Sequence, residues 1–217
     1  MKILVTTGAT REYIDPVRFI SNDASGRLGV EITRQSNERG HDTCMVHGPL
    51  HLAVSDIQIP EEVERVAVLT TAEMSREVRA RYDTVDVVFM VAAVADFRPI
   101  QYSPGKLKRK SPEQVFKFSR TEDILKGLGA DKTHQFLVGF NLETEDPEPE
   151  ARRKLKEKNL DLIVLNGPEN MGSLDATVRV MDIEGITAAW EALSKTEIAR
   201  RLVMLVEERA GNRDAGR

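Results

Sequence analysis

The sequence alternates short apolar runs with amphipathic helical patterns, and this alternation constrains the fold more than any other feature. Runs typical of strands lie at 2–6, 43–47, 63–68, 85–91, 136–140 and 160–165. Helical patterns lie between them at 26–39, 71–82, 122–128 and 147–158. Such alternation predicts a parallel sheet covered by helices on both faces. The run 85–91 is almost wholly apolar, which is typical of a central strand buried on both sides.

Two further pairs of runs predict hairpins. The runs 177–183 and 185–189 predict an antiparallel addition at the edge of the sheet. The runs 107–110 and 115–118 predict a second hairpin around Ser111-Pro112. Because no linker divides the chain, we expect one domain over residues 1–210 and a frayed polar tail over 211–217.

Composition narrows the classes of function. A net charge of −4 and a pI near 5.7 give no reason to expect a nucleic acid or a membrane surface as partner. No apolar run approaches the length of a membrane span. The one cysteine, Cys44, fits a reducing cytoplasm, and its apolar surroundings predict a buried thiol rather than a nucleophile. The four histidines lack the spacing of a zinc site, so we expect no metal held by the protein alone.

The segment from Arg11 to Gly29 separates the first strand from the first helical pattern. It is roughly three times as long as the usual strand-to-helix loop. Loops of this length in compact domains are commonly functional or disordered. The apolar residues in this one argue against disorder; they are Tyr13, Ile14, Val17, Phe19 and Ile20. The sequence therefore predicts a built site in this segment.

Glycines flank this long segment. Gly8 ends the first strand, and Gly26 and Gly29 open the helical pattern. Small residues at a helix N-terminus expose amides that bind phosphate, although the same glycines also suit close helix packing. Their spacing is not the compact dinucleotide fingerprint, and no acidic residue follows the second strand. A nicotinamide-dependent dehydrogenase is therefore disfavoured.

Asn22 lies in the same segment, between Ser21 and Ser25. A side-chain amide there can donate to a carbonyl oxygen on which negative charge develops. The alternative is an Asx-turn, or a cap for the following helix.

The segment Ala92-Ala93-Val94-Ala95-Asp96 directly follows the central strand. Its small residues would let a ligand approach the backbone at the carboxyl edge of the sheet. Asp96 could then accept a hydrogen bond from the ligand or help to hold Mg²⁺. Alternatively, Asp96 is a turn residue paired with Arg98.

Two lysine-rich segments follow. Residues 105–110 are either a mobile flap over a triphosphate or a solvated edge strand protected by its lysines. Lys154 and Lys158 share one helix face and, with Phe140, could frame a nucleotide. Alternatively, Lys154 simply pairs with Glu150 on the helix surface.

The order of these motifs resembles phosphopantothenoylcysteine synthetase. The resemblance covers residues 1 to about 166. It rests on Gly8-Ala9-Thr10-Arg11-Glu12, Asp15-Pro16-Val17-Arg18-Phe19-Ile20-Ser21-Asn22, Ser25-Gly26 with Gly29, Ala92-Ala93-Val94-Ala95-Asp96-Phe97-Arg98, Pro104-Gly105-Lys106-Leu107-Lys108, Gly139-Phe140 with Glu143-Thr144, and Ala151-Arg152 with Lys154 and Lys158-Asn159-Leu160-Asp161.

This resemblance implies a fold and an activity. The fold would be α/β, a Rossmann-like three-layer sandwich with a mostly parallel sheet, helices on both faces and an antiparallel edge hairpin, assembled as a homodimer. The enzyme would be a cytoplasmic ligase of coenzyme A biosynthesis. It would use CTP or ATP, with Mg²⁺, to convert 4'-phosphopantothenate into an acyl nucleotidylate, which L-cysteine then attacks to form the amide.

The resemblance also assigns roles to residues. Asn22 would assist the second half-reaction, and Lys106 would support formation of the intermediate. Nucleotide-contacting positions would be Gly8, Met90, Val91, Ala92, Asp96, Lys106, Asp123, Ile124, Phe140, Lys154 and Lys158. Substrate-contacting positions would be Arg18, Ser21, Asn22, Ser25, Gly26, Ala92 and Ala93.

Some residues depart from the family pattern. In many bacterial members a flavin-dependent decarboxylase domain precedes the synthetase. Because this chain begins at the first strand of the synthetase, we expect it to have neither decarboxylase activity nor a flavin. Many bacterial members read Gly-Phe-Ala-Ala-Glu-Thr where this chain has Asn141-Leu142, which leaves CTP and ATP open as co-substrates. The alternatives are a short-chain NAD(P)H oxidoreductase, whose Tyr-x-x-x-Lys pair is not found here, and a non-catalytic nucleotide-binding relative, which would be expected to lose Asn22 or Lys106.

Overall fold

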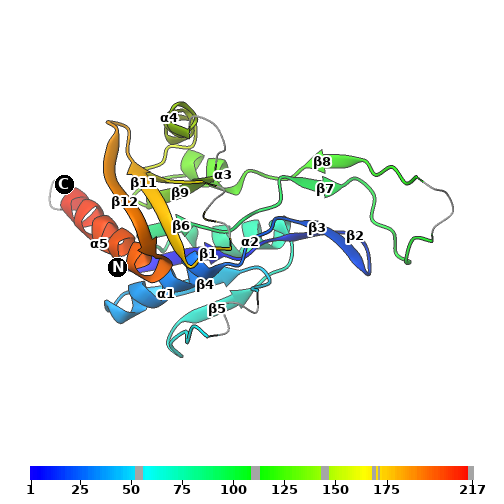
Figure 1. Ribbon diagram of the computed structural model, residues 1–217, viewed down its shortest axis with the longest axis horizontal. Coiled ribbons are helices and arrows are strands. Elements are labelled where there is room, and N and C mark those ends of the chain that lie inside the picture. Colours follow the sequence, from blue (N-terminus) through cyan, green and yellow to red (C-terminus); the bar gives the residue numbers. More distant parts are fainter. Residues whose placement is uncertain (52–55, 109–112, 143–146, 168–169, 171, 215–217) are drawn as a thin grey trace.

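The computed structural model describes residues 1–51, 56–108, 113–142, 147–167, 170 and 172–214. Within these residues eight strands form one sheet in the order β12-β11-β10-β9-β6-β1-β4-β5 (Figure 1). Every pairing from β10 across to β5 is parallel, whereas β11 and β12 are antiparallel additions at one edge. These strands are β1 (Lys2–Thr7), β4 (Asp42–His47), β5 (Glu64–Ala67), β6 (Val87–Met90), β9 (Phe136–Leu142), β10 (Leu162–Asn166), β11 (Asp175–Met181) and β12 (Ile186–Ser194).

Helices cover both faces of this sheet. On one face lie α2 (Thr71–Tyr82), α3 (Ile124–Ala130) and α4 (Pro147–Glu157), and on the other lie α1 (Arg27–Glu38) and α5 (Lys195–Asp214). Side chains alternate between the faces along each strand, so Leu4 packs towards α2 whereas Ile3 packs towards α5. The predicted three-layer α/β sandwich with a mostly parallel sheet and an antiparallel edge hairpin is confirmed.

Several smaller predictions can also be compared with the structure. Cys44 is buried on β4, and burial followed by the charge of Glu64 raises the pKa of its thiol to about 12. Among the described residues, no helix is both long and apolar enough to cross a membrane. The predicted tail boundary at Gly211 falls inside α5, which continues to Asp214, and residues 215–217 lie outside the described part of the chain.

A projecting arm, which the sequence did not predict in this form, leaves the carboxyl edge of the sheet (Figure 1). It consists of two antiparallel strand pairs, β2 (Arg11–Asp15) with β3 (Arg18–Ser21) and β7 (Phe97–Pro99) with β8 (Phe118–Arg120), and of the described residues 100–108 and 113–117 between them. The long segment after β1 therefore folds as a hairpin. Its turn forms because the carboxylate of Asp15 accepts from the backbone N–H groups of Val17 and Arg18, each at 2.9 Å.

The hairpin predicted from 107–110 and 115–118 is wrong in its pairing. β8 pairs instead with β7, so that Pro99 lies opposite Phe118. Leu107 is held by the other hairpin: its N–H donates to Asp15 at 3.1 Å, and its carbonyl accepts from Arg18. These contacts use the backbone groups that the predicted ladder would have needed. Residues 109–112 lie outside the described part of the chain.

The segments that follow β1 and β6 remain hydrogen-bonded to each other beyond the sheet. The N–H of Ala93 donates to the Gly8 carbonyl at 2.9 Å, and the N–H of Thr10 donates to the Ala93 carbonyl at 3.4 Å. The fully buried hydroxyl of Thr10 also accepts from the N–H of Ala95 at 2.8 Å. Both strand ends are therefore fixed side by side before they turn into the arm.

We predict that Asp15→Asn loosens the arm. Burial acts to raise the pKa of Asp15, but the N–H groups of Val17 and Leu107 and the Arg18 guanidinium outweigh it and lower the pKa. A lowered pKa stabilises the folded arm above the ordinary Asp value of about 4, and this contribution is lost as the pH falls below it. The variant should show faster hydrogen exchange at Val17 and Leu107 at neutral pH, and the wild-type protein should approach that behaviour only in acid.

The exposed Asp42→Asn variant on β4 is the control, and its exchange rates in the arm should match those of the wild-type protein. Unchanged exchange at Leu107 in Asp15→Asn would contradict this account.

Candidate functional site

A cavity of about 970 Å³ opens where β1, β6, β9 and β10 end. Its floor includes Gly8 after β1 and the segment from Met90 to Val94 after β6. After β1 the chain continues to β4, which lies on one side of β1 in the sheet, whereas after β6 it continues to β9, which lies on the opposite side. The adjacent strands β1 and β6 therefore form the switch point at which open α/β sheets bind ligands. The cavity continues onto both faces of the sheet, towards α3 and α4 on one side and towards α1 and α5 on the other.

Asn22 is one of the residues that line the cavity. Its side-chain Nδ2 donates to the carbonyl of Val94 at 3.0 Å, which joins the long first connection to the segment after β6. The alternative role of Asn22 as a helix cap is wrong, because the N-cap of α1 is Gly26 and the N–H of Arg27 at that helix end donates to the hydroxyl of Ser25 at 3.3 Å. Asn22 thus presents an exposed amide beside Ala92 and Ala93, which line the same cavity.

The glycines at the start of α1 are required by packing. A Cβ on Gly29 would lie 2.3 Å from the hydroxyl oxygen of Thr7, and Gly26 adopts φ +81. The Thr7 hydroxyl donates to the carbonyl of Gly26 at 2.7 Å and so holds the helix start against β1. The close-packing interpretation is confirmed, and the same close approach brings the N-terminus of α1 to the cavity wall.

One end of the cavity, towards α3 and α4, carries Lys154 and Lys158. Lys158 forms an ion pair with Asp123 at 2.8 Å, and Asp123 also caps α3. Burial acts to raise the pKa of Asp123, but the hydrogen bonds from Lys158 and from the N–H of Lys126 outweigh it and lower the pKa. Lys154 donates to the side-chain carbonyl of Asn141 at 2.5 Å and lies 3.5 Å from Glu150. The predicted Glu150–Lys154 pair therefore exists, and it does not keep Lys154 away from the cavity.

The opposite end of the cavity, towards α1 and α5, carries Arg27 and Lys195. Lys195 donates to the carbonyl of Asn170 at 3.2 Å. Burial, and then the charge of Arg27, lower the pKa of Lys195. An ammonium that is partly desolvated and close to a second cation gains stability when an anion binds beside it.

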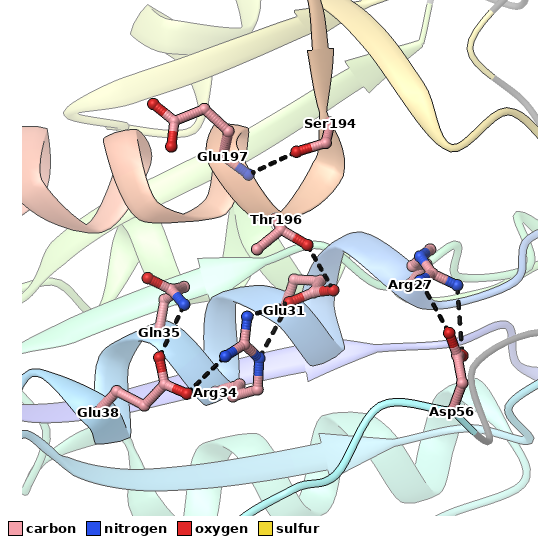
Figure 2. A network of polar contacts seen from close by, with 9 residues as sticks. All are labelled: Arg27, Glu31, Arg34, Gln35, Glu38, Asp56, Ser194, Thr196 and Glu197. Atoms are coloured by element: carbon pink, nitrogen blue, oxygen red, sulfur yellow. Dashed lines mark hydrogen bonds and ion pairs between the residues drawn. The ribbon is translucent and has the colours of Figure 1, made fainter.

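A polar network fixes the helices that carry these two cations (Figure 2). The Thr196 hydroxyl donates at 2.8 Å to Glu31, whose carboxylate is only 3% exposed and also accepts from Arg34. Glu31 is one turn after Arg27 on α1 (Figure 2), and Thr196 directly follows Lys195 at the start of α5. The buried hydrogen bond between α1 and α5 therefore places the two cations at the same end of the cavity.

The structure gathers most of the predicted site residues into this one cavity. Those that line it are Gly8, Asn22, Ser25, Gly26, Met90, Val91, Ala92, Ala93, Asp96, Asp123, Ile124, Phe140, Lys154 and Lys158. Asp96 is exposed there, and no ion pair with Arg98 is found within the described residues.

Three predicted residues do not line the cavity within the described part of the chain. Ser21 donates to the carbonyl of Thr10, and Arg18 pairs with Asp15 at 2.7 Å in the arm. Lys106 is exposed in the connection between β7 and β8. Two cationic residues of the predicted site, Arg18 and Lys106, therefore lie in the arm and not in the cavity of the same chain.

Sequence reasoning missed several polar residues of the cavity. They are Arg27, Asn141, Asn166, Asn170 and Lys195. Lys195 follows Ser194, whose hydroxyl accepts from the N–H of Glu197 at 3.2 Å, so the Ser-x-x-Glu pattern, which is typical of a helix start, also marks this lysine. The position of Asn141 at the end of β9, next to Phe140, was a comparable signal.

No group of three or more His, Cys, Asp or Glu side chains among the described residues could hold a metal ion. The carboxylates that line the cavity are those of Asp23, Asp96, Glu122 and Asp123.

Comparison with known proteins places the chain in a family. The profile described as "DNA/pantothenate metabolism flavoprotein C-terminal domain" matches residues 1–209. The coenzyme A biosynthesis bifunctional protein CoaBC of Bacillus subtilis is 40% identical over 171 residues, which are 79% of this chain and 41% of that protein. A cysteine/cysteine sulfinic acid decarboxylase of an unknown prokaryotic organism is 36% identical over 207 residues, which are 93% of this chain and 56% of that protein. The chain thus spans about half the length of these curated relatives.

A solved structure agrees with the sequence comparison. The crystal structure of the C-terminal domain of the coenzyme A biosynthesis bifunctional protein CoaBC superposes with a TM-score of 0.82 at 35% identity, and the match covers 97% of this chain and 96% of that domain. The resemblance to phosphopantothenoylcysteine synthetase, which the motifs predicted, is confirmed at the level of the family. The chain belongs to the family of the C-terminal domain of DNA/pantothenate metabolism flavoproteins.

Proposed function

We propose that this protein is a ligase of coenzyme A biosynthesis that joins 4'-phosphopantothenate to L-cysteine at the expense of a nucleoside triphosphate. The observation that carries the proposal is the cavity itself, which is lined by Lys154 and Lys158 towards α4, by Arg27 and Lys195 towards α1 and α5, and by Asn22. Two anionic substrates that must react with each other need such an arrangement. The similarity to CoaBC supports the same activity.

Charge suggests how the substrates lie. The triphosphate occupies the end with Lys154 and Lys158, while Phe140 lines the cavity from the face of β9 that packs towards α1 and α5. The phosphate of the acid occupies the end with Arg27 and Lys195, near the N-terminal amides of α1. The carboxylate of the acid then reaches the middle of the cavity, where Ala92 and Ala93 leave the backbone open to it.

The chemistry follows in two steps. The carboxylate oxygen attacks the α-phosphorus of the triphosphate, pyrophosphate leaves, and an acyl nucleotidylate forms. The amine of L-cysteine then attacks the acyl carbon, and the nucleoside monophosphate leaves from the resulting tetrahedral intermediate. Asn22, released from Val94, donates to the oxygen on which negative charge develops in this second step. Mg²⁺ bound to the triphosphate would neutralise phosphate charge and polarise the phosphorus, and Asp96 is the side chain that would contact it.

A homodimer completes the proposed site. The arm exposes many apolar side chains, which is typical of an interaction surface. They are Val17, Phe19, Ile20, Phe97, Ile100, Tyr102, Val115, Phe116 and Phe118. We propose that the arm of one protomer packs against the other, and that it places its Arg18 and Lys106 at the partner's cavity.

Nucleotide choice and location belong to the same proposal. Both CTP and ATP are candidate co-substrates, since the cations of the cavity recognise phosphate rather than base. A cytoplasmic enzyme is proposed because the buried thiol of Cys44 suits a reducing compartment. The family match does not favour the short-chain oxidoreductase or the non-catalytic alternative.

The first test is the complete reaction. Purified protein, 4'-phosphopantothenate, L-cysteine, MgCl₂ and CTP or ATP should yield pyrophosphate and the amide product, measured by coupled assay and mass spectrometry. Omitting the acid should abolish pyrophosphate release. Failure to form the amide with either nucleotide would refute the proposal.

The second test separates the half-reactions. Asn22→Ala should slow amide formation by about a hundredfold, because one oxyanion donor is lost, while pyrophosphate release is partly kept. The acyl nucleotidylate should therefore accumulate, and quenched samples examined by mass spectrometry would detect it. Amide formation at the wild-type rate would remove Asn22 from this role.

The third test concerns the phosphate of the acid. Lys195→Met should raise the KM for 4'-phosphopantothenate roughly tenfold, since one hydrogen bond to a charged group is lost, and leave the KM for the triphosphate unchanged. The discrimination against unphosphorylated pantothenate should fall by the same factor. The exposed Lys156→Met variant on α4 is the control and should behave as wild type. A rise confined to the triphosphate KM would contradict the placement of the substrates.

The fourth test asks whether the arm acts across the dimer. Lys106→Ala and Asn22→Ala should each be nearly inactive in amide formation. If Lys106 serves the partner's cavity, mixing and re-associating the two variants should restore about a quarter of wild-type activity, because half of the dimers are mixed and each has one intact site. No restoration, with mixed dimers verified by native mass spectrometry, would place Lys106 at its own cavity or outside the reaction.

A further inference from the structure

One buried polar atom in the cavity wall is left without a partner. Asn141 is only 2% exposed, and its side-chain Nδ2 forms no hydrogen bond in the structure. The other buried side-chain atom of this kind among the described residues is the hydroxyl of Ser36 on α1. Ser36 does not belong to the cavity lining, whereas Asn141 does.

The orientation of the Asn141 carboxamide is set by Lys154. An ammonium has only donors, so the atom that faces Nζ of Lys154 must be the carbonyl oxygen Oδ1. The NH₂ group is then fixed on the other side and cannot turn to find a different partner. A buried donor without an acceptor is costly, and a native structure tolerates few of them.

The surroundings identify what the free donor could bind. Lys154 and Lys158 lie at the same end of the cavity, and Phe140 precedes Asn141 on β9. An anion that draws the ammonium of Lys154 towards itself would uncover the carboxamide. The carboxamide, no longer held by Lys154, can then turn its NH₂ group towards the ligand, and this donor requires an oxygen or ring-nitrogen acceptor.

We propose that Asn141 is a nucleotide-recognition residue. Before the ligand binds, its carbonyl holds the ammonium of Lys154. When a nucleoside triphosphate enters, Lys154 moves to the phosphate oxygens and the Asn141 amide donates to an acceptor on the nucleotide. This inference rests on the proposed function, since it takes the Lys154 end of the cavity as the nucleotide site.

The experiment compares Asn141→Leu with the wild-type protein. Leucine has a similar size but no polar atoms, so the unpaired donor disappears and the melting temperature should be unchanged or higher. The KM for the triphosphate should nevertheless rise roughly tenfold, the loss expected for one hydrogen bond to a charged ligand, while the KM values for 4'-phosphopantothenate and L-cysteine stay constant. Equilibrium binding of CTP and ATP should weaken by the same factor.

Ser36→Ala is the matched control. It removes the other unpaired buried donor, which is remote from the cavity, and it should leave every KM unchanged. If Asn141→Leu does not fold, Asn141→Ala takes its place with the same measurements.

Each outcome decides the matter. A triphosphate KM and affinity equal to the wild type would overturn the inference, and so would a lowered melting temperature with all KM values changed together, which indicates a purely structural role. A wild-type protein that binds a triphosphate more tightly than the variant but forms no amide would reject the proposed ligation and leave the inference standing. A wild-type protein that binds neither CTP nor ATP would overturn both.

Discussion

The cavity and the arm both depend on the hydrogen bonds that hold the segments after β1 and β6 together beyond the sheet. Two parallel strands normally separate at a switch point, because their connections leave for opposite sides. Here the Gly8 carbonyl and the buried hydroxyl of Thr10 bind the N–H groups of Ala93 and Ala95. The floor of the cavity is therefore a fixed backbone surface, and both hairpins of the arm start from it.

Charge inside this cavity runs opposite to the charge of the whole protein. The net charge is −4, which would repel phosphorylated ligands in solution. At one end Lys154 is on α4 and Lys158 directly follows that helix, whereas Arg27 and Lys195 at the other end come from two helices that are distant in the sequence. The buried contact between Glu31 and Thr196 brings these two helices together (Figure 2). Local geometry, rather than overall composition, thus creates the positive ends.

The two lysines at one end of the cavity are already paired with polar side chains of the protein. Lys158 is paired with Asp123, and Lys154 is held by Asn141 and Glu150, so each lysine already has a polar partner. A ligand with several phosphate oxygens can replace these partners without leaving any cation unpaired. The unpaired Nδ2 of Asn141 is the one feature of this end that the protein's own contacts do not explain, within the residues the structure describes.

Sequence periodicity determined the layers of this protein, because the apolar character of a strand or helix face is local information. The run 85–91, for example, indicated the buried central strand β6. The motifs also located most of the cavity, since the carboxyl ends of parallel strands meet at one edge. Only the tertiary structure decided which strands pair in the arm, because Asp15 and Arg18 engage Leu107 from 92 and 89 residues away in the sequence. The same holds for Lys195: its sequence position predicts a helix start, and only the packing of α5 on α1 places it beside Arg27, because a contact between distant segments leaves no periodic pattern in either one.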